Sequence, residues 1–173
     1  MGKDKIDFFE ASTQSLLRKL DAMKMDKMSR IRAKNFARAI RDSMLNPDVQ
    51  IQTFNLRSHQ CNVGYDSVGF CRVASLSFMN LMSEKNTITQ DWDLFVVNGR
   101  DTDHHFLQHR LDGAIFDLTF DQFSYNGIVV PYKCAHRTFV GVIDKDPLYD
   151  FYNACGFDKF KPLDLPLIGF KDR

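Results

Sequence analysis

Apolar residues recur every three or four positions through the first part of the chain, which predicts two amphipathic helices before residue 48. The first carries an apolar face of Ile6, Phe9, Leu16, Leu17, Leu20 and Met23. The second takes Ser29 as its N-cap and ends at Asn46-Pro47, because proline cannot continue a helix. Its apolar face consists of Ile31, Phe36, Ala37, Ile40 and Met44.

The middle of the chain changes pattern twice. Weak alternation over Val49–Leu56 predicts a strand, and residues 57–70, which include Gly64 and Gly69, predict a loop. A third helix is predicted from Cys71 to the polar run at residues 83–86. Its apolar residues are Val73, Ala74, Leu76, Phe78, Leu81 and Met82.

Strand patterns dominate the rest of the chain, followed by one more helix. The strands are predicted at Trp92–Val97, His104–His109, Ala114–Thr119 and Arg137–Ile143. The helix runs from Asp146, as N-cap, to Gly156 beyond its end. This order predicts an α+β fold in which helices pack on an antiparallel sheet. We expect a single domain over 1–173, with a helical part at 1–48 and a core at 49–173.

Composition limits the class of protein. Of the 173 residues, 44% are hydrophobic and sixteen are Phe, enough to fill a core and to exclude a disordered chain. No apolar run reaches the roughly 18 residues of a membrane span, and the charged start does not resemble a secretory signal. We therefore expect a cytoplasmic protein with no membrane partner. The cysteines are then free thiols, at Cys61, Cys71, Cys134 and Cys155.

The net charge of +1 conceals a basic N-terminal part. Residues 1–48 hold eleven Lys and Arg against seven Asp and Glu, so the remainder carries −3. The basic residues of the second helix's polar face are Arg30, Lys34, Arg38 and Arg41. They form either a docking surface for an acidic partner or an ordinary solvated face. The acids among them and the absence of stacking aromatics argue against a nucleic-acid partner.

Cys71 is the cysteine best placed for chemistry. It follows a glycine-containing loop and starts an apolar helix, where the helix dipole lowers a thiol pKa from its usual value of about 8.5. The free N–H groups of that helix end also suit a developing oxyanion. A nucleophilic thiol further requires a histidine base and a group that orients it. The alternative is a buried core thiol.

The hairpin signal Asp112-Gly113 bears on which histidine serves as the base. If it is a two-residue turn, His104 and Asp117 point the same way and His105 points the opposite way. His104 would then lie opposite residue 121, four residues from Asp117, so direct contact requires a wider loop. Parity favours His104 as the base, and His105 remains the alternative.

These motifs resemble the transglutaminase-like branch of the papain-like cysteine superfamily. The matching residues are Gly69, Cys71 and Ala74, then His104, Phe106 and Gln108, then Gly113, Asp117 and Thr119. The run from Asp117 to Phe123, after His104-His105-Phe106 and Asp112-Gly113, is closer still to the uncharacterised YunG-like group of small bacterial and phage proteins. The resemblance covers roughly residues 61–125.

The resemblance implies a papain/transglutaminase-like core and a Cys–His–Asp triad acting on an amide in a protein or peptide. Cys71 would be the nucleophile, His104 the base and Asp117 the residue that orients it. The reaction would be peptide hydrolysis, glutamine deamidation or transglutaminase-like transfer, with no cofactor. Tyr65 stands where the papain branch has an oxyanion-binding Gln, so Gln60 or Asn62 would take that role. Gln122-Phe123 is interpreted as packing a corner of the sheet.

Three other hypotheses remain. The fold could carry an inactive site in a binding protein that docks through its basic helix. His59, Cys61, Cys134 and His136 could hold zinc, although their spacing is unusual and no metal is expected. Residues 148–157 resemble the tail of GNAT-type acetyltransferases, but the phosphate-binding loop of those enzymes is absent.

Overall fold

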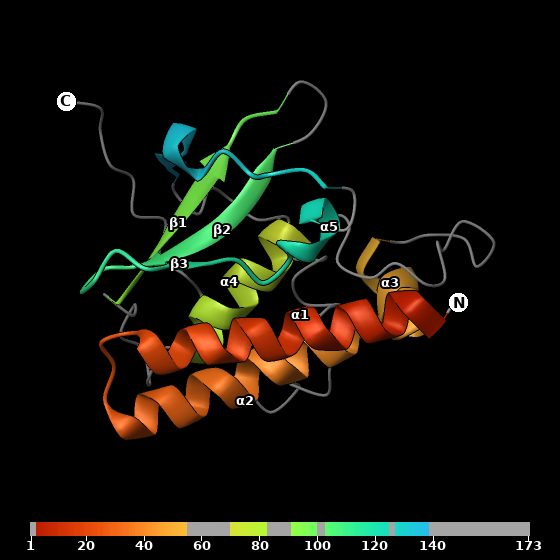
Figure 1. The fold of residues 1–173 in the computed structure, drawn as a ribbon, viewed down its shortest axis with the longest axis horizontal. Coiled ribbons are helices and arrows are strands. Elements are labelled where there is room, and N and C mark those ends of the chain that lie inside the picture. Colours follow the sequence, from red (N-terminus) through yellow and green to blue (C-terminus); the bar gives the residue numbers. More distant parts are fainter. Residues whose placement is uncertain (1–2, 55–69, 83–90, 100–102, 125–126, 139–173) are drawn as a thin grey trace.

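The computed structural model describes residues 3–54, 70–82, 91–99, 103–124 and 127–138, and these form an α+β arrangement. The helices are α1 (Lys3–Ala22), α2 (Lys27–Met44), α3 (Pro47–Phe54), α4 (Cys71–Met82), α5 (Asp121–Ser124) and a 3-10 turn, η2 (Tyr132–Cys134). The strands are β1 (Trp92–Val97), β2 (His104–His109), β3 (Ile115–Phe116) and β4 (His136–Arg137). The long helices α1 and α2 lie side by side, and α4 packs between them and the sheet (Figure 1).

The sheet has the order β3-β2-β1-β4 within the described residues, and each neighbouring pair is antiparallel. The strands β1 and β2 have the predicted bounds, with Leu94 opposite Leu107. The strand β3 is shorter than the predicted Ala114–Thr119, because the chain leaves the sheet at Asp117, whose side chain forms hydrogen bonds with its surroundings instead. The predicted strand from Arg137 and the helix from Asp146 lie largely or wholly outside the described residues.

The predicted strand at Val49–Leu56 is wrong over the part that the structure describes, because Pro47–Phe54 is helical. One local hydrogen bond and the backbone angle of one proline outweigh the weak alternation. The Asn46 side chain accepts a hydrogen bond from the Asp48 amide at 2.9 Å, and Pro47 already has the backbone angle of a first helical residue. Val49 then points into the core.

The start of α2 also differs from the prediction. Asp26, rather than Ser29, is the N-cap, and its carboxylate accepts hydrogen bonds from the amides of Met28 and Ser29. A carboxylate cap also interacts favourably with the positive end of the helix. Ile31, predicted to be buried, is 43% exposed, because α2 turns Ala33, Ala37, Ile40 and Met44 toward the core.

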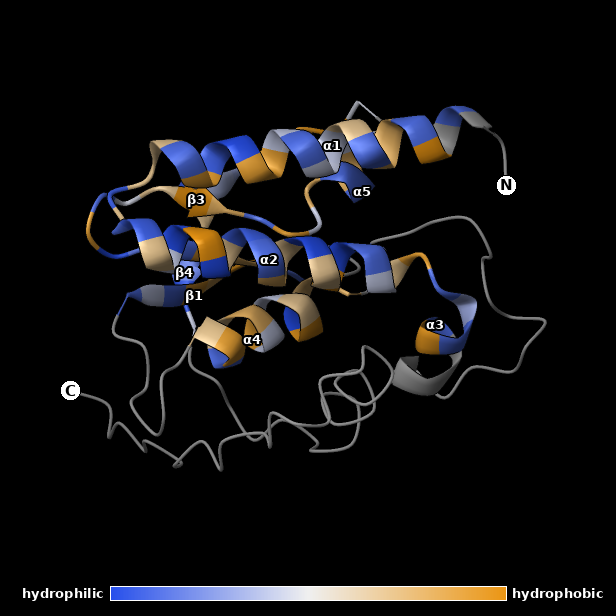
Figure 2. Ribbon diagram, turned by 90° about the horizontal axis from the view of Figure 1, so that it is seen from below, coloured by the Kyte–Doolittle hydropathy of each residue, from blue (hydrophilic) through white to orange (hydrophobic). Residues whose placement is uncertain are grey.

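The core lies between the helix pair, α4 and the sheet. Hydrophobic and hydrophilic residues alternate along α1 and α2, whereas α4 is largely hydrophobic (Figure 2). Phe78 of α4 contacts Trp92 of β1 and Phe116 of β3, with ring centroids 5.2 and 4.9 Å apart. This packing places the first residue of α4 against β2.

No helix of the described residues is long and apolar enough to cross a bilayer.

The sequence pattern predicts Arg41 on the polar face of α2. In the structure, Arg41 is completely buried. Its guanidinium forms an ion pair with Asp121 and donates to the carbonyl oxygen of Leu118. It also donates to Ser12 and Thr13 of α1 and lies 3.8 Å from the centroid of the Phe9 ring. A buried arginine is stable only when its donors are satisfied in this way.

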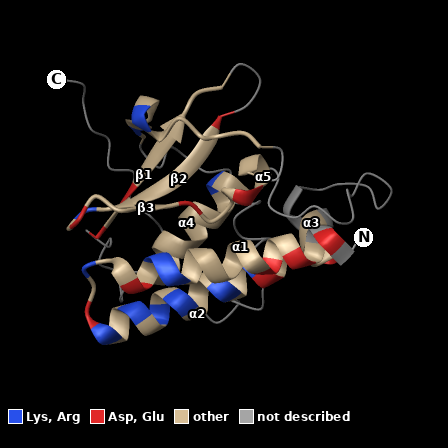
Figure 3. Ribbon diagram, in the orientation of Figure 1, with Lys and Arg blue, Asp and Glu red and all other residues tan. Residues whose placement is uncertain are grey.

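The proposed basic row on α2 is therefore interrupted. Lys34 and Arg38 are at the surface, but Lys34 pairs with Asp21 at 2.6 Å and Arg38 pairs with Glu10 at 2.7 Å. Figure 3 shows acidic residues interspersed with the basic ones along α1 and α2. The two helices thus present a mixed rather than a uniformly basic surface.

The buried ion pair predicts a large difference between two arginines of the same helix. Arg41→Ala removes the arginine from a buried ion pair, so we expect a loss of about 3–5 kcal/mol in the free energy of unfolding. Arg38→Ala breaks a surface pair and should cost at most about 1 kcal/mol. Urea denaturation of the two variants measures both values. Equal losses would contradict the role given to Arg41.

Candidate active site

Cys71 is the first residue of α4, directly after Phe70. The Ala74 amide donates to the Phe70 carbonyl at 2.7 Å, which marks the first turn. The amide groups at the start of a helix have no acceptors within it and can therefore bind another group. The Cys71 side chain is buried, and its Sγ atom lies 3.8 Å from the carbonyl oxygen of Asp103, directly before β2.

The hairpin between β2 and β3 sets the position of Asp117. The His109 amide donates to the Ala114 carbonyl and the Gly113 amide to the His109 carbonyl, so residues 110–113 form a four-residue loop. The sequence indicated a two-residue turn at Asp112-Gly113, and the structure shows that this is wrong. The Asp112 carboxylate instead contacts the His109 ring at 2.8 Å and the Lys24 amide at 2.7 Å. Gly113 takes a φ of 69°, which glycine adopts without strain.

This loop shifts the register by two residues relative to the tight turn. Leu107 lies opposite Phe116, so Asp117 follows β3 on the diagonal from His104. A two-residue shift keeps the same side chains on the same face. The prediction that His104 and Asp117 share a face, with a wider loop between their strands, is therefore confirmed.

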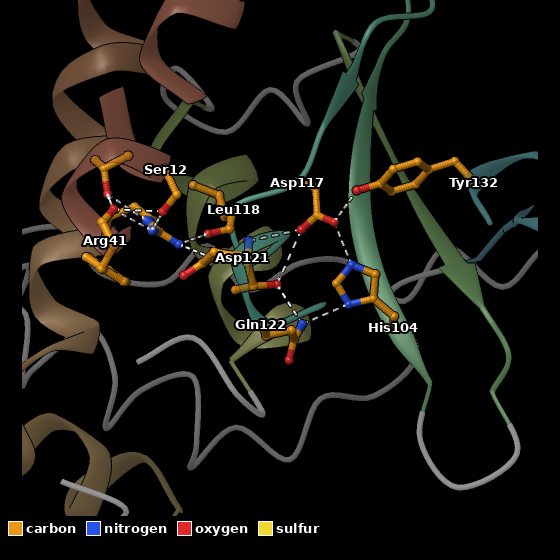
Figure 4. Close-up of polar contacts among 11 residues, drawn as sticks. Ser12, Arg41, His104, Asp117, Leu118, Asp121, Gln122 and Tyr132 are labelled. Atoms are coloured by element: carbon orange, nitrogen blue, oxygen red, sulfur yellow. Dashed lines mark hydrogen bonds and ion pairs between the residues drawn. The ribbon is translucent and has the colours of Figure 1, made fainter. Parts of the chain in front are cut away.

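His104 and Asp117 form a buried pair. The Nε2 atom of His104 lies 2.6 Å from Oδ2 of Asp117, and both side chains are at most 5% exposed. The same Oδ2 accepts a hydrogen bond from the Tyr132 hydroxyl at 2.8 Å. The Oδ1 atom accepts from the amide of Thr119 at 2.9 Å and from its hydroxyl at 3.3 Å (Figure 4). The carboxylate is thus held by four donors on two sides.

The second nitrogen of the His104 ring faces Gln122. Nε2 of Gln122 lies 3.1 Å from Nδ1 of His104 and 3.2 Å from the Thr119 hydroxyl oxygen. Phe123 packs edge-on against the imidazole, with ring centroids 4.6 Å apart. Gln122 and Phe123, interpreted from the sequence as a corner of the sheet, therefore also contact the candidate base.

Electrostatics favour a charged Cys71–His104 pair. Burial raises the pKa of the Cys71 thiol, but hydrogen bonding with the His104 and His105 side chains outweighs this effect and lowers the pKa to about 6. Burial lowers the pKa of His104, but its hydrogen bonds with Asp117 and Cys71 outweigh this and raise the pKa to about 9. Both shifts act toward a thiolate beside an imidazolium.

His105 also lies near the thiol. Its side chain and its amide both help to lower the pKa of Cys71, although its side chain was predicted to point away from the His104 face. Its Nδ1 atom is buried and makes no hydrogen bond with the described residues. Asp117 contacts His104 rather than His105, which distinguishes the oriented histidine from its neighbour.

Several predicted residues lie outside the described part of the chain. These are the oxyanion candidates Gln60 and Asn62, the zinc candidates His59 and Cys61, and the acetyltransferase-like segment 148–157. Cys134 and His136 are exposed, and no group of three or more His, Cys, Asp or Glu side chains in the described residues is arranged to hold a metal ion. Tyr132 was not predicted, because no sequence pattern links it to Asp117.

Comparison with known proteins yields no relative. No known family model matches the chain, and neither the curated proteins nor the solved structures contain a match. The functional interpretation therefore depends on the geometry of Cys71, His104 and Asp117, together with the sequence motifs.

The pKa values predict the pH dependence of thiol labelling. The rate at which iodoacetamide alkylates Cys71 should rise with an inflection near pH 6, the pKa of the thiol, rather than near the roughly 8.5 of a free cysteine. Asp117→Asn removes the charge that stabilises the imidazolium, so it should move the inflection toward higher pH. Mass spectrometry of the labelled protein across a pH series measures both.

A nearby carboxylate provides the control for this prediction. Asp103 directly precedes His104, but its side chain is exposed and contacts Asn98. Asp103→Asn should leave the inflection within a few tenths of a pH unit of the wild-type value, since exposed charges are strongly screened. An equal shift in both variants would mean that Asp117 acts only through general charge.

Proposed function

We propose that this protein is a cysteine-dependent amide hydrolase or acyltransferase with Cys71, His104 and Asp117 as its catalytic triad. The observation that carries the proposal is the buried His104–Asp117 hydrogen bond at 2.6 Å, beside a thiol at the start of α4. Peptidase, glutamine deamidase and transglutaminase-like activities share this chemistry. The resemblance of the sequence motifs to the transglutaminase-like branch supports the same assignment.

In the proposed reaction, the Cys71 thiolate attacks the carbonyl carbon of the substrate amide. The oxyanion that forms accepts hydrogen bonds from amide groups at the start of α4, including that of Cys71 itself. The His104 imidazolium then donates its proton to the leaving amine as the C–N bond breaks, which leaves a thioester on Cys71. Neutral His104 next takes a proton from water or an acceptor amine as that molecule attacks the thioester. The thiolate leaves and the cycle is complete.

In this reaction, Asp117 orients the His104 ring and stabilises its charged form. Its buried carboxylate accepts the Nε2 hydrogen of His104, so the ring keeps one orientation and uses Nδ1 for proton transfer. The Tyr132 hydroxyl and the Thr119 amide keep the carboxylate in place while the charge of the imidazole changes. The charge of Asp117 stabilises the imidazolium form.

The alternative of an inactive binding protein receives less support. It depended on a row of Lys34, Arg38 and Arg41 on one helix face, and Arg41 is buried. The exposed members of the row are already paired with acids of α1. We therefore do not propose a basic docking surface.

Acylation by an activated ester tests the proposed function. p-Nitrophenyl acetate should release a burst of nitrophenolate as it acetylates Cys71, and Cys71→Ala should abolish the burst. His104→Ala should slow it by about a hundredfold or more. Cys134→Ala is the matched control, because Cys134 is an exposed free thiol whose loss should leave the burst unchanged.

The same variants then separate the possible activities. A glutamine-containing peptide incubated with the wild-type protein should release either ammonia or peptide fragments, which distinguishes deamidation or transfer from hydrolysis of the chain. A burst that persists in Cys71→Ala, or that disappears in Cys134→Ala, would contradict the assignment of Cys71.

A further inference from the structure

The hydrogen-bond partners around His104 favour particular positions for its protons. An ionised carboxylate can only accept, so the Thr119 hydroxyl donates to Asp117 and must itself accept from Gln122. The atom of Gln122 that faces Thr119 is therefore the amide nitrogen. The same nitrogen lies 3.1 Å from Nδ1 of His104, where it donates a hydrogen bond whenever Nδ1 carries no proton (Figure 4).

Cys71 also has an acceptor that suits its uncharged form. Its Sγ atom lies 3.8 Å from the Asp103 carbonyl oxygen, to which only a protonated thiol can donate. The hydrogen-bond partners around the site thus favour an uncharged thiol and an uncharged imidazole. The charges of the site act in the opposite direction, because the Asp117 carboxylate favours a proton on His104.

We propose that Gln122 is a positioning residue that stabilises the uncharged form of the Cys71–His104 pair. This inference rests on the proposed function. In the step itself, the S–H bond of Cys71 breaks and an N–H bond forms at Nδ1 of His104. The products are a thiolate and an imidazolium, and no further reactant takes part.

Two substitutions at Gln122 test the inference. Gln122→Met has a similar length but no N–H group, so the uncharged imidazole loses its donor. We expect the inflection of Cys71 alkylation by iodoacetamide to fall by roughly half to one pH unit, which makes labelling well below the inflection about three- to tenfold faster. Gln122→Glu places an acceptor beside Nδ1 and should shift the inflection further in the same direction. Gln14→Met, on the exposed side of α1, should leave it unchanged.

A second measurement does not depend on the reactivity of Cys71. In a Cys71→Ala background, nuclear magnetic resonance follows the titration of the His104 ring, which Gln122→Met should move to higher pH. An unchanged or lower His104 pKa would overturn the inference, as would an alkylation inflection that stays in place or rises. If the proposed function fails because Cys71 proves unreactive, the His104 titration still decides the role of Gln122.

Discussion

The buried Arg41–Asp121 ion pair connects the helical layer of this protein to its candidate site. Arg41 reaches from α2 to the Leu118 carbonyl and to Asp121, and its remaining donors are satisfied by α1. The segment between these contacts also holds Thr119 and directly follows Asp117. One guanidinium therefore determines where the chain goes after it leaves β3, and hence where the Asp117 carboxylate lies. The two long helices are part of the site's framework, although neither contributes a residue to the chemistry.

The hairpin loop supplies the second constraint. A four-residue loop places Leu107 opposite Phe116, and the chain then leaves the sheet with Asp117 beside His104. Asp112 holds this loop by bonding to the His109 ring and to the Lys24 amide, between α1 and α2. The helical part thus contacts the β2–β3 hairpin and the segment after it at two places, through Arg41 and through Lys24. Displacement of either helix would move Asp117 and Gln122, the two hydrogen-bond partners of the His104 ring.

Local patterns predicted much of this arrangement. The bounds of β1, β2 and the start of α4 follow from spacing alone. Face parity favoured His104 over His105 as the partner of Asp117, but their direct contact depended on a wider loop than Asp112-Gly113 indicated. The predictions that were wrong or missing have two causes. Some residues are positioned by contacts that are distant in the sequence, and one segment is positioned by a local contact that outweighs its pattern. Arg41 resembles any basic residue on a polar helix face until the acceptors of Leu118 and Asp121 are placed beside it. Tyr132 reaches Asp117 from a turn that has no pattern of its own, and Asn46 and Pro47 start a helix where alternation suggested a strand.

Residues 117–122 provide the hydrogen-bond partners of both ring nitrogens of His104, and these partners have opposite effects on its protonation. Asp117 accepts at Nε2 and favours a proton on the ring, whereas Gln122 donates at Nδ1 and opposes one. The Thr119 hydroxyl bridges the two, so their effects cannot be independent. In the proposed reaction, a carboxylate alone would favour the charged pair throughout and would make the imidazolium a weaker acid when the leaving amine needs its proton. An amide at the opposing nitrogen would reduce this energy difference, so that His104 could take and release a proton within the same proposed cycle.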